Sequence, residues 1–260
     1  MRRGRNRVER VRTLFALMGV ISLIATGYIY TLAVGYHTTP VADRIGIEDR
    51  EDITAEELYE TVKEGLYVNE ACVDGEYRHR KAAEYLERLL YVCPHCGLSS
   101  FESHGDIVTC KTCGRKARYT PTKELEGDFP YRFVADWYDA QEAFINQLDV
   151  TEKAEALYTE QVALSEVIPY KKKVLLDKKA TVALYGHSIS VKWKDEERVF
   201  TFEELLAVTV LGRNKLNIYF DDRVLQFKGG KRFNAVKYVH LFHRYKNLKR
   251  GNDHEQFLGL

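Results

Sequence analysis

The sequence lacks two features that would indicate its chemistry directly, a strong net charge and a catalytic motif. Its formal net charge is +1, which argues against bulk binding of nucleic acid. It has no glycine-rich phosphate loop and no Gly-x-Ser-x-Gly nucleophile elbow. Hydrophobic residues make up 45% and charged residues 30%, which excludes an extended disordered chain. The composition therefore indicates a folded protein with one large domain or two small ones, and without a recognisable catalytic motif.

Cysteine is also scarce, with five residues in 260, but four of the five form two regular pairs. Each pair has two intervening residues and a following glycine, and thirteen residues separate Cys96 from Cys110. This spacing lets two tight turns direct four sulfurs at one point, and it predicts a zinc ribbon. The predicted ligands are Cys93, Cys96, Cys110 and Cys113. Four thiolates leave no open coordination position, so the predicted Zn²⁺ is structural and not catalytic.

Two disulfides or free thiols are the alternative for these cysteines, and an exported chain could carry either. The fifth cysteine, Cys72, would then have no partner. Between the two pairs, Ser103–Asp106 has the composition of a hairpin turn, so we expect His104 to be a turn residue and not a ligand. His240 and His243 are three residues apart in a predicted helix, and we expect them at a surface or an interface.

The amino-terminal segment predicts association with a membrane. Six arginines lie in the first twelve residues, and residues 13–34 contain no charge. As a helix this apolar segment would be ~33 Å long, enough to span a bilayer core. A cleavable signal peptide and a buried core segment are the alternatives. The charge pattern would place the amino terminus in the cytoplasm and the body outside, which conflicts with a thiolate zinc site because such sites favour a reducing compartment.

Two helices are predicted between the membrane segment and the cysteines. Thr54 and Glu57 have the spacing of a capping box, and Ile53 with Leu58 forms a hydrophobic staple, so a helix begins there. A second helix is predicted over residues 77–91, because leucines recur on one face and charges surround them.

A third amphipathic helix is predicted over residues 133–144, with Trp137 and Phe144 as packing anchors. From residue 161 the pattern changes to short alternating runs separated by turns, which predicts an antiparallel sheet or small barrel. The expected strands are VALSEVI, KVLLD, TVALYG, SISVKW, RVFTF, LAVTVLG, KLNIYF and RVLQFKG. A helix over residues 234–248 follows, and strands closed by one helix are similar in architecture to pleckstrin-homology (PH) and GRAM domains.

The predicted fold class is α+β: an N-terminal membrane helix, a helical pair, a zinc ribbon, and an antiparallel β-barrel closed by a helix. The expected divisions are a basic terminus with the membrane helix (1–34), a linker with the helical pair (35–92), the ribbon (93–118), a linker with the Trp-bearing helix (119–158) and the barrel-like domain (159–260).

Basic residues near the ends of the predicted strands are candidates for binding a phospholipid headgroup. If these basic residues cluster at one rim of the barrel, each of them would contribute roughly 1 kcal/mol to headgroup binding. The alternative is a set of solvated turns. The candidates are Lys171, Lys172, Lys173, Lys228, Lys231 and Arg232.

Residues 53–71 (ITAEELYETVKEGLYVNEA) and 77–97 (YRHRKAAEYLERLLYVCPHCG) resemble the tail of bacterial 1-acyl-glycerol-3-phosphate (lysophosphatidic acid) acyltransferase-like proteins. Residues 35–40 (GYHTTP) are similar to the end of the catalytic domain, and Trp137, KYVHLFHRYKN and EQFLGL resemble later parts of the tail. The resemblance covers residues 35–260. It implies phospholipid metabolism at the cytoplasmic leaflet, and thus a cytoplasmic body, contrary to the charge pattern.

The acyltransferase family catalyses with a histidine and an aspartate separated by four residues, and a later glycine-containing block holds the glycerol phosphate. Five residues separate His37 from Asp43, and the glycine-containing block is missing, so no catalytic residue is transferred. The favoured hypothesis is a non-catalytic, membrane-associated accessory module that binds phospholipid, an acyltransferase or another protein.

Two further hypotheses are an acyltransferase fragment whose catalytic domain is missing from this reading frame, and a zinc-ribbon protein that binds nucleic acid. The nucleic-acid-binding hypothesis is weaker because the net charge is near neutral and few cations lie close to the cysteines. These cations are Lys111, Arg115, Lys116 and Arg118.

Overall fold

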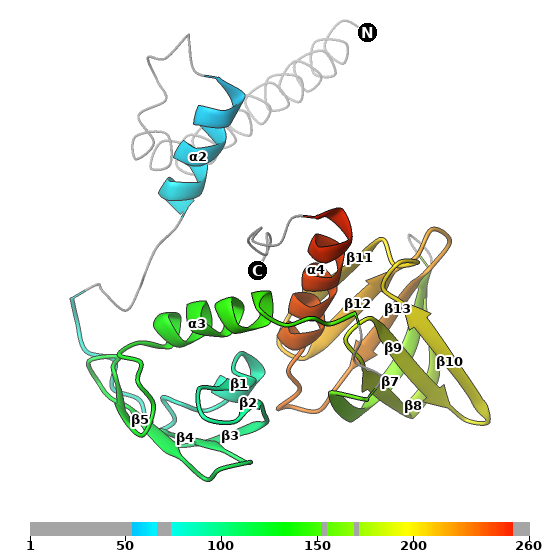
Figure 1. The fold of residues 1–260 in the computed structure, drawn as a ribbon. Coiled ribbons are helices and arrows are strands. Elements are labelled where there is room, and N and C mark those ends of the chain that lie inside the picture. Colours follow the sequence, from blue (N-terminus) through cyan, green and yellow to red (C-terminus); the bar gives the residue numbers. More distant parts are fainter. Residues whose placement is uncertain (1–53, 67–73, 152–154, 169–171, 252–260) are drawn as a thin grey trace, which may run out of the picture. The chain divides into compact units, whose positions relative to one another are not determined.

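A computed structural model describes residues 54–66, 74–151, 155–168 and 172–251 (Figure 1). The chain divides into two compact units, Met1–Glu70 and Ala71–Leu260. In the described ranges, no helix is long and apolar enough to cross a membrane. The predicted span at residues 13–34 lies outside these ranges, as do Cys72 and Lys171. The membrane helix therefore stays a prediction.

The described part of the first unit is helix α2 (Ala55–Leu66), and it begins as predicted. The Glu57 N–H donates to Thr54 Oγ1 at 3.2 Å, and the Thr54 N–H donates to the Glu57 carboxylate at 3.0 Å. These reciprocal bonds form the expected capping box. Ile53 lies outside the described residues, so the predicted hydrophobic staple is not tested.

The helix predicted over residues 77–91 is wrong. Among residues 74–91 the structure has turns and one short 3₁₀ helix, η2 (Leu86–Arg88). The Ala83 N–H donates to the Gly105 carbonyl, and the Tyr85 N–H donates to Ser103 Oγ, each at 2.8 Å. Because these N–H groups bond to the ribbon, they cannot donate to carbonyls four residues earlier, as an α-helix would require. Tyr85 also has a left-handed φ of 76°, which is not helical. Tertiary contacts here override a helical pattern.

Residues 92–127, which include the predicted ribbon (93–118) and are called the ribbon from here on, form two small antiparallel sheets. Strands β1 (Val92–Cys93) and β2 (Gly97–Leu98) form one. The other has the order β3-β4-β5-β6, with bounds Phe101–His104, Ile107–Cys110, Lys116–Tyr119 and Leu125–Gly127. His104 pairs with Ile107 across the β3–β4 turn, and its side chain is 66% exposed. The predicted hairpin is therefore confirmed, and His104 lies at its turn.

Helix α3 (Val134–Asn146) packs on the ribbon and runs toward the last helix (Figure 1). The Phe133 N–H donates to the Asp136 carboxylate at 2.8 Å, which satisfies a donor at the helix start. Trp137 is fully buried, and its Nε1 donates to the Val92 carbonyl at 2.8 Å. Trp137 is thus the packing anchor that the sequence predicted.

The second half of the chain is one seven-stranded sheet in which all neighbours are antiparallel. Its order is β10-β9-β8-β7-β13-β12-β11. The bounds from β7 to β13 are Tyr158–Ile168, Lys172–Leu184, Ser188–Trp193, Glu196–Thr201, Ala207–Leu211, Lys215–Tyr219 and Val224–Lys228. The prediction is corrected at one place: KVLLD and TVALYG are parts of the single strand β8, because the chain does not turn at Lys178–Lys179.

Helix α4 (Val236–Arg250) closes the fold against the sheet (Figure 1). Tyr238 and Leu241 are fully buried in the same core as the inward side chains of the strands, such as Leu216 and Phe227. The helix ends at Gly251, whose φ of 75° is the left-handed conformation that favours glycine after a helix. The predicted α+β class with a largely antiparallel sheet is confirmed.

Candidate metal centre

The four cysteines predicted as ligands converge in the ribbon. Cys93 ends β1, Cys110 ends β4, and Cys96 and Cys113 lie in the turns that follow. Their sulfur atoms all lie within 4.8 Å of one another. The ribbon folds so that residues on two separate hairpins supply one compact set of four thiols.

Glycine makes both turns possible. Gly97 and Gly114 have φ angles of 73° and 72°, a region that residues with a Cβ rarely adopt. The Gly114 N–H donates to the Cys110 carbonyl at 2.9 Å and closes the second turn. The glycines after each cysteine pair therefore have the role that their spacing predicted.

A buried serine, Ser99, orients one of the thiols. Its hydroxyl lies 3.1 Å from Cys110 Sγ and 2.7 Å from Thr112 Oγ1. Burial raises the pKa of the Cys110 thiol, but hydrogen bonds from Ser99 and from the N–H groups of Cys113 and Thr112 outweigh burial and lower the pKa to about 6. Cys110 therefore becomes a thiolate before Cys93 and Cys96 do.

The other inner thiols resist ionisation. The side chain of Cys113, followed by burial and by Cys93, raises the pKa of Cys96 to about 12. Burial raises the pKa of Cys93. Four thiolates would repel one another at this separation unless a cation balanced them. A divalent metal that bound here would displace the protons of these thiols.

The sulfur positions fit tetrahedral zinc. Zinc–sulfur bonds of ~2.3 Å place the corners of a tetrahedron ~3.8 Å apart. Cys93 Sγ lies 3.8 Å from Cys113 Sγ, and all four described cysteines are free thiols. A disulfide would need sulfurs ~2.05 Å apart. The donor set could hold a soft divalent ion with no position left for water.

The ribbon is joined to the sheet by a buried hydrogen-bond network around His240. His240 is fully buried; its Nδ1 lies 2.6 Å from the Tyr91 hydroxyl and its Nε2 lies 2.8 Å from the Tyr138 hydroxyl. The Tyr158 hydroxyl donates to the carbonyls of Tyr91 and Ser99 at 3.1 and 3.2 Å. His240 is thus an interface residue, and the same contacts link the sheet to the serine beside Cys110.

Arg232 forms a second link between the ribbon and the sheet. Its guanidinium makes ion pairs with Glu87 and, at 2.9 Å, with Glu84, and it donates to the Ser103 carbonyl at 2.8 Å. The carboxylate of Glu87 is only 3% exposed. These contacts give Arg232, which the sequence placed among the headgroup candidates, a structural role. Its neighbour Lys231 is exposed.

The lysine candidates lie at the ends of β8 and β13. Lys172 and Lys173 begin β8, and Lys228 ends β13 opposite Lys215 of β12. Burial lowers the pKa of Lys173, and the charges of Lys215 and Lys228 lower it further. Among the described ion pairs, none involves these four lysines.

Sequence reasoning missed three contributors to these sites. Lys215 is an isolated lysine in the sequence, and only strand pairing brings it beside Lys228. Ser99 follows a cysteine pair, but its bond to Cys110 spans eleven residues. The bond between Tyr91 and His240 spans 149 residues and leaves no local pattern.

The cations near the cysteines are partly engaged within the ribbon. Arg118 pairs with Asp106 at 2.8 Å, and Arg115 lies 2.6 Å from a ring nitrogen of His95. Lys111 and Lys116 are exposed.

Comparison with known proteins gives a slight likeness to solved structures. The chain matches no protein-family model and no curated protein. Among the solved structures that it matches is the solution structure of the N-terminal PH domain of human ARAP2 protein. The identity is 18%, the TM-score is 0.30, and the match covers 39% of this chain and 90% of that one. A likeness at this TM-score gives no argument for a shared ligand.

Proposed function

We propose that the chain is a non-catalytic accessory module of a phospholipid membrane, in which a structural Zn²⁺ fixes the ribbon and the seven-stranded, PH-like domain binds an anionic headgroup. The observation that carries the proposal is the convergence of four thiols within 4.8 Å, tied to the sheet by buried hydrogen bonds. A closed four-thiolate shell stabilises a fold and has no position for a substrate. Relationship to the tail of acyltransferase-like proteins is part of the same proposal.

The headgroup site proposed here consists of Lys172, Lys173, Lys215 and Lys228. Like charges close enough to lower the pKa of Lys173 leave a net positive potential on this face. Below this cluster, Lys173 Nζ donates to the Gln226 side chain, and Gln226 Nε2 donates to Asn217 Oδ1 at 2.9 Å. This polar chain holds the Lys173 side chain in place, so an anion would meet at least one ordered cation.

The expected affinity is modest. Each lysine near an anionic surface contributes about 1 kcal/mol, so three or four give a factor on the order of 10² to 10³ in binding. The predicted membrane span would keep the body near headgroups, and the high local concentration would make such an affinity sufficient.

Soluble short-chain lipids test the headgroup site with the full chain in detergent. We expect dihexanoyl phosphatidate to bind, because its phosphate carries a net negative charge, and dihexanoyl phosphatidylcholine not to bind. The double variant Lys173→Glu/Lys228→Glu should lower phosphatidate affinity at least about tenfold, measured by titration calorimetry.

The matched control is Lys192→Glu/Lys194→Glu, which reverses two exposed lysines at the end of β9 and in the β9–β10 turn. This control should bind phosphatidate like the wild type. Equal binding of phosphatidate and phosphatidylcholine, or equal losses in the two double variants, would contradict the proposed site.

A further inference from the structure

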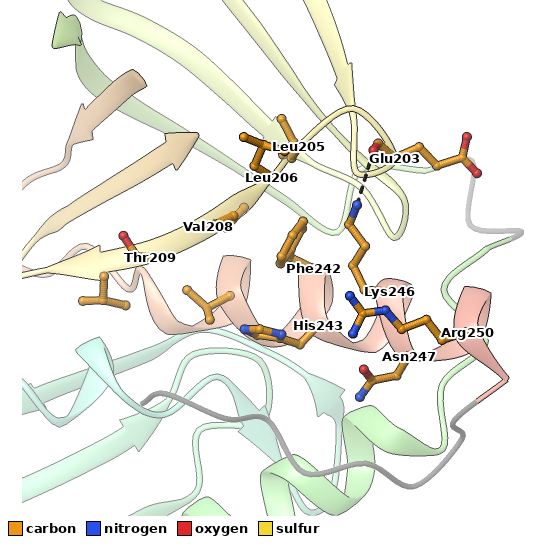
Figure 2. A pocket seen from close by; sticks show the side chains of 13 residues that line it. Glu203, Leu205, Leu206, Val208, Thr209, Phe242, His243, Lys246, Asn247 and Arg250 are labelled. Carbon is orange, nitrogen blue, oxygen red and sulfur yellow. Dashed lines mark hydrogen bonds between the residues drawn. The ribbon is translucent and has the colours of Figure 1, made fainter. Parts of the chain in front are cut away.

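A groove of about 560 Å³ lies between α4 and the edge strand β11 (Figure 2). Part of it is apolar, and Leu206 and Val210 are accessible apolar residues of its lining. Toward the carboxyl end of α4 the lining becomes polar and basic, with Lys246 and Arg250 (Figure 2). The groove therefore has an apolar part and a cationic end.

The strand beside this groove has the features of a docking edge. Within the described ranges, β11 pairs with β12 on one side and with no strand on the other. An edge strand presents unpaired N–H and C=O groups to any extended segment beside it. Leu206, which lines the groove, and Leu211 at the end of β11 are 61% and 45% exposed. Large exposed apolar side chains next to a strand edge indicate a surface that another segment covers.

The charge at the basic end favours an acidic occupant. Burial lowers the pKa of His243 and of Lys246, and the charge of Arg250 lowers both further. The nearby carboxylate of Glu203 already pairs with Lys249 at 3.0 Å and accepts from the Tyr245 hydroxyl at 2.9 Å. Lys246 Nζ also donates to the Glu203 carbonyl at 3.3 Å. A carboxylate from another segment would add a counter-charge beside Lys246 and Arg250.

The chain itself supplies a segment with matching chemistry. Directly after Gly251 the sequence reads NDHEQFLGL, with Asp253 and Glu255 first and Phe257, Leu258 and Leu260 after them. The left-handed Gly251 ends α4 at the cationic end of the groove. A segment that turned back along α4 would meet the cations first and the apolar part second, in the same order as its own acidic and apolar residues.

The lengths are compatible as well. The five residues of β11 span about 17 Å, and nine extended residues reach about 30 Å. Because the segment is attached to the helix that forms one side of the groove, its effective concentration there is on the order of millimolar. A weak peptide interaction would then be largely formed.

We propose that the groove between α4 and β11 binds residues 252–260 of the same chain, with Asp253 and Glu255 at Lys246 and Arg250 and with the apolar residues along Leu206 and Val210. This inference is independent of the headgroup and zinc proposals.

Hydrogen exchange of the full chain tests this assignment. The double variant Phe257→Ser/Leu260→Ser should raise the exchange rate of β11 amides about tenfold, as expected for loss of an intramolecular contact with a dissociation constant of about 0.1 mM. Gln256→Ser in the same segment is the control and should leave exchange unchanged.

A charge swap separates specific docking from a general loss of stability. Lys246→Glu/Arg250→Glu should expose β11 to exchange, and adding Asp253→Lys/Glu255→Lys should restore protection. Arg213→Glu, an exposed cation in the β11–β12 turn, should have no effect. Unchanged exchange in the Phe257→Ser/Leu260→Ser variant would overturn the proposal. Protection that rises with protein concentration would also overturn it, since it would indicate the segment of a second copy.

Discussion

At the scale of single residues, a side chain that is not a predicted ligand contacts one thiol of the candidate metal centre. The Ser99 hydroxyl contacts both Cys110 Sγ and Thr112 Oγ1. The Ser99 carbonyl accepts a hydrogen bond from the Tyr158 hydroxyl. Ser99 therefore couples the orientation of one thiol to the sheet domain. Groups of this kind set ligand geometry and tune affinity for the metal.

Ser99→Ala should weaken zinc binding about 10- to 100-fold without loss of the ribbon, because the four sulfurs remain while one loses its orienting hydrogen bond. Competition with a chromogenic chelator measures this change. Ser100→Ala, at an exposed neighbouring position, is the control. Equal affinities of the two variants would show that Ser99 has no influence on the site.

His240 makes the stability of the body depend on pH. Burial, with a smaller contribution from His243, lowers the pKa of His240 to about 3. An unfolded histidine titrates near pH 6.5, so below that pH the unfolded chain takes up a proton that the folded chain refuses. Stability should therefore fall as the pH falls below 6.5, and His240 should add nothing to the pH dependence of stability above that value.

Glu142 acts in the opposite direction over a narrower range. Burial and the charge of Asp139 raise its pKa to about 6, so the folded chain takes up this proton before the unfolded one. Between pH 6 and 4.5 this uptake offsets part of the loss caused by His240.

His240→Gln should flatten the pH dependence. Between pH 7 and pH 5, the wild type should lose about 2 kcal/mol more of its unfolding free energy than the variant does. Urea titrations followed by tryptophan fluorescence, with zinc content checked at each pH, measure the difference. His79→Gln removes an exposed histidine that is in none of the described ion pairs, and it should behave as the wild type does. Parallel pH profiles for wild type and His240→Gln would contradict the assignment.

At the scale of secondary-structure elements, the segment before the first cysteine is shaped by the ribbon and not by its own sequence pattern. Arg232 lies in the loop between β13 and α4, and it pairs with Glu84 and Glu87 of this segment. Ser103 of β3 contacts both Tyr85 and Glu87. These contacts hold the segment in turns across the junction of ribbon and sheet.

Arg232→Met should destabilise the body by about 1–3 kcal/mol. The change leaves the buried Glu87 carboxylate without its cation, and the partial solvent exposure of Arg232 lowers the cost below that of a fully buried pair. Thermal unfolding of Arg232→Met beside Lys231→Met, which alters an exposed neighbour, checks this. An equal, small effect of both changes would indicate that the ion pairs are dispensable.

The elements also show which features a sequence can predict. The capping box of α2, the buried Trp137 of α3 and the strands of the sheet follow local patterns, and the structure has them. The helix over residues 77–91 was predicted from periodicity alone, but its N–H groups bond to residues of the β3–β4 hairpin. The sulfurs were predictable because cysteine spacing is local, whereas Lys215 reaches its site only through strand pairing.

At the scale of the whole molecule, the ribbon and the sheet have separate apolar cores that share their supporting segments. Leu90 and Cys93 belong to the ribbon core, while Tyr91 and Val92 between them belong to the core of the sheet. Helix α3 likewise places Trp137 in one core and Ile145 in the other. A metal that fixes Cys93 therefore constrains both cores, so loss of the metal should affect the stability of both parts.

The direct test of this account is the metal content of the purified chain together with its folding. We expect about one Zn²⁺ per chain, and we expect Cys93→Ser or Cys110→Ser to lose both the metal and the cooperative unfolding transition, because binding free energy of the ion contributes to folding. Cys72→Ser should retain both. A chain that folds cooperatively without metal, with its unfolding transition unchanged by a chelator, would contradict the central claim.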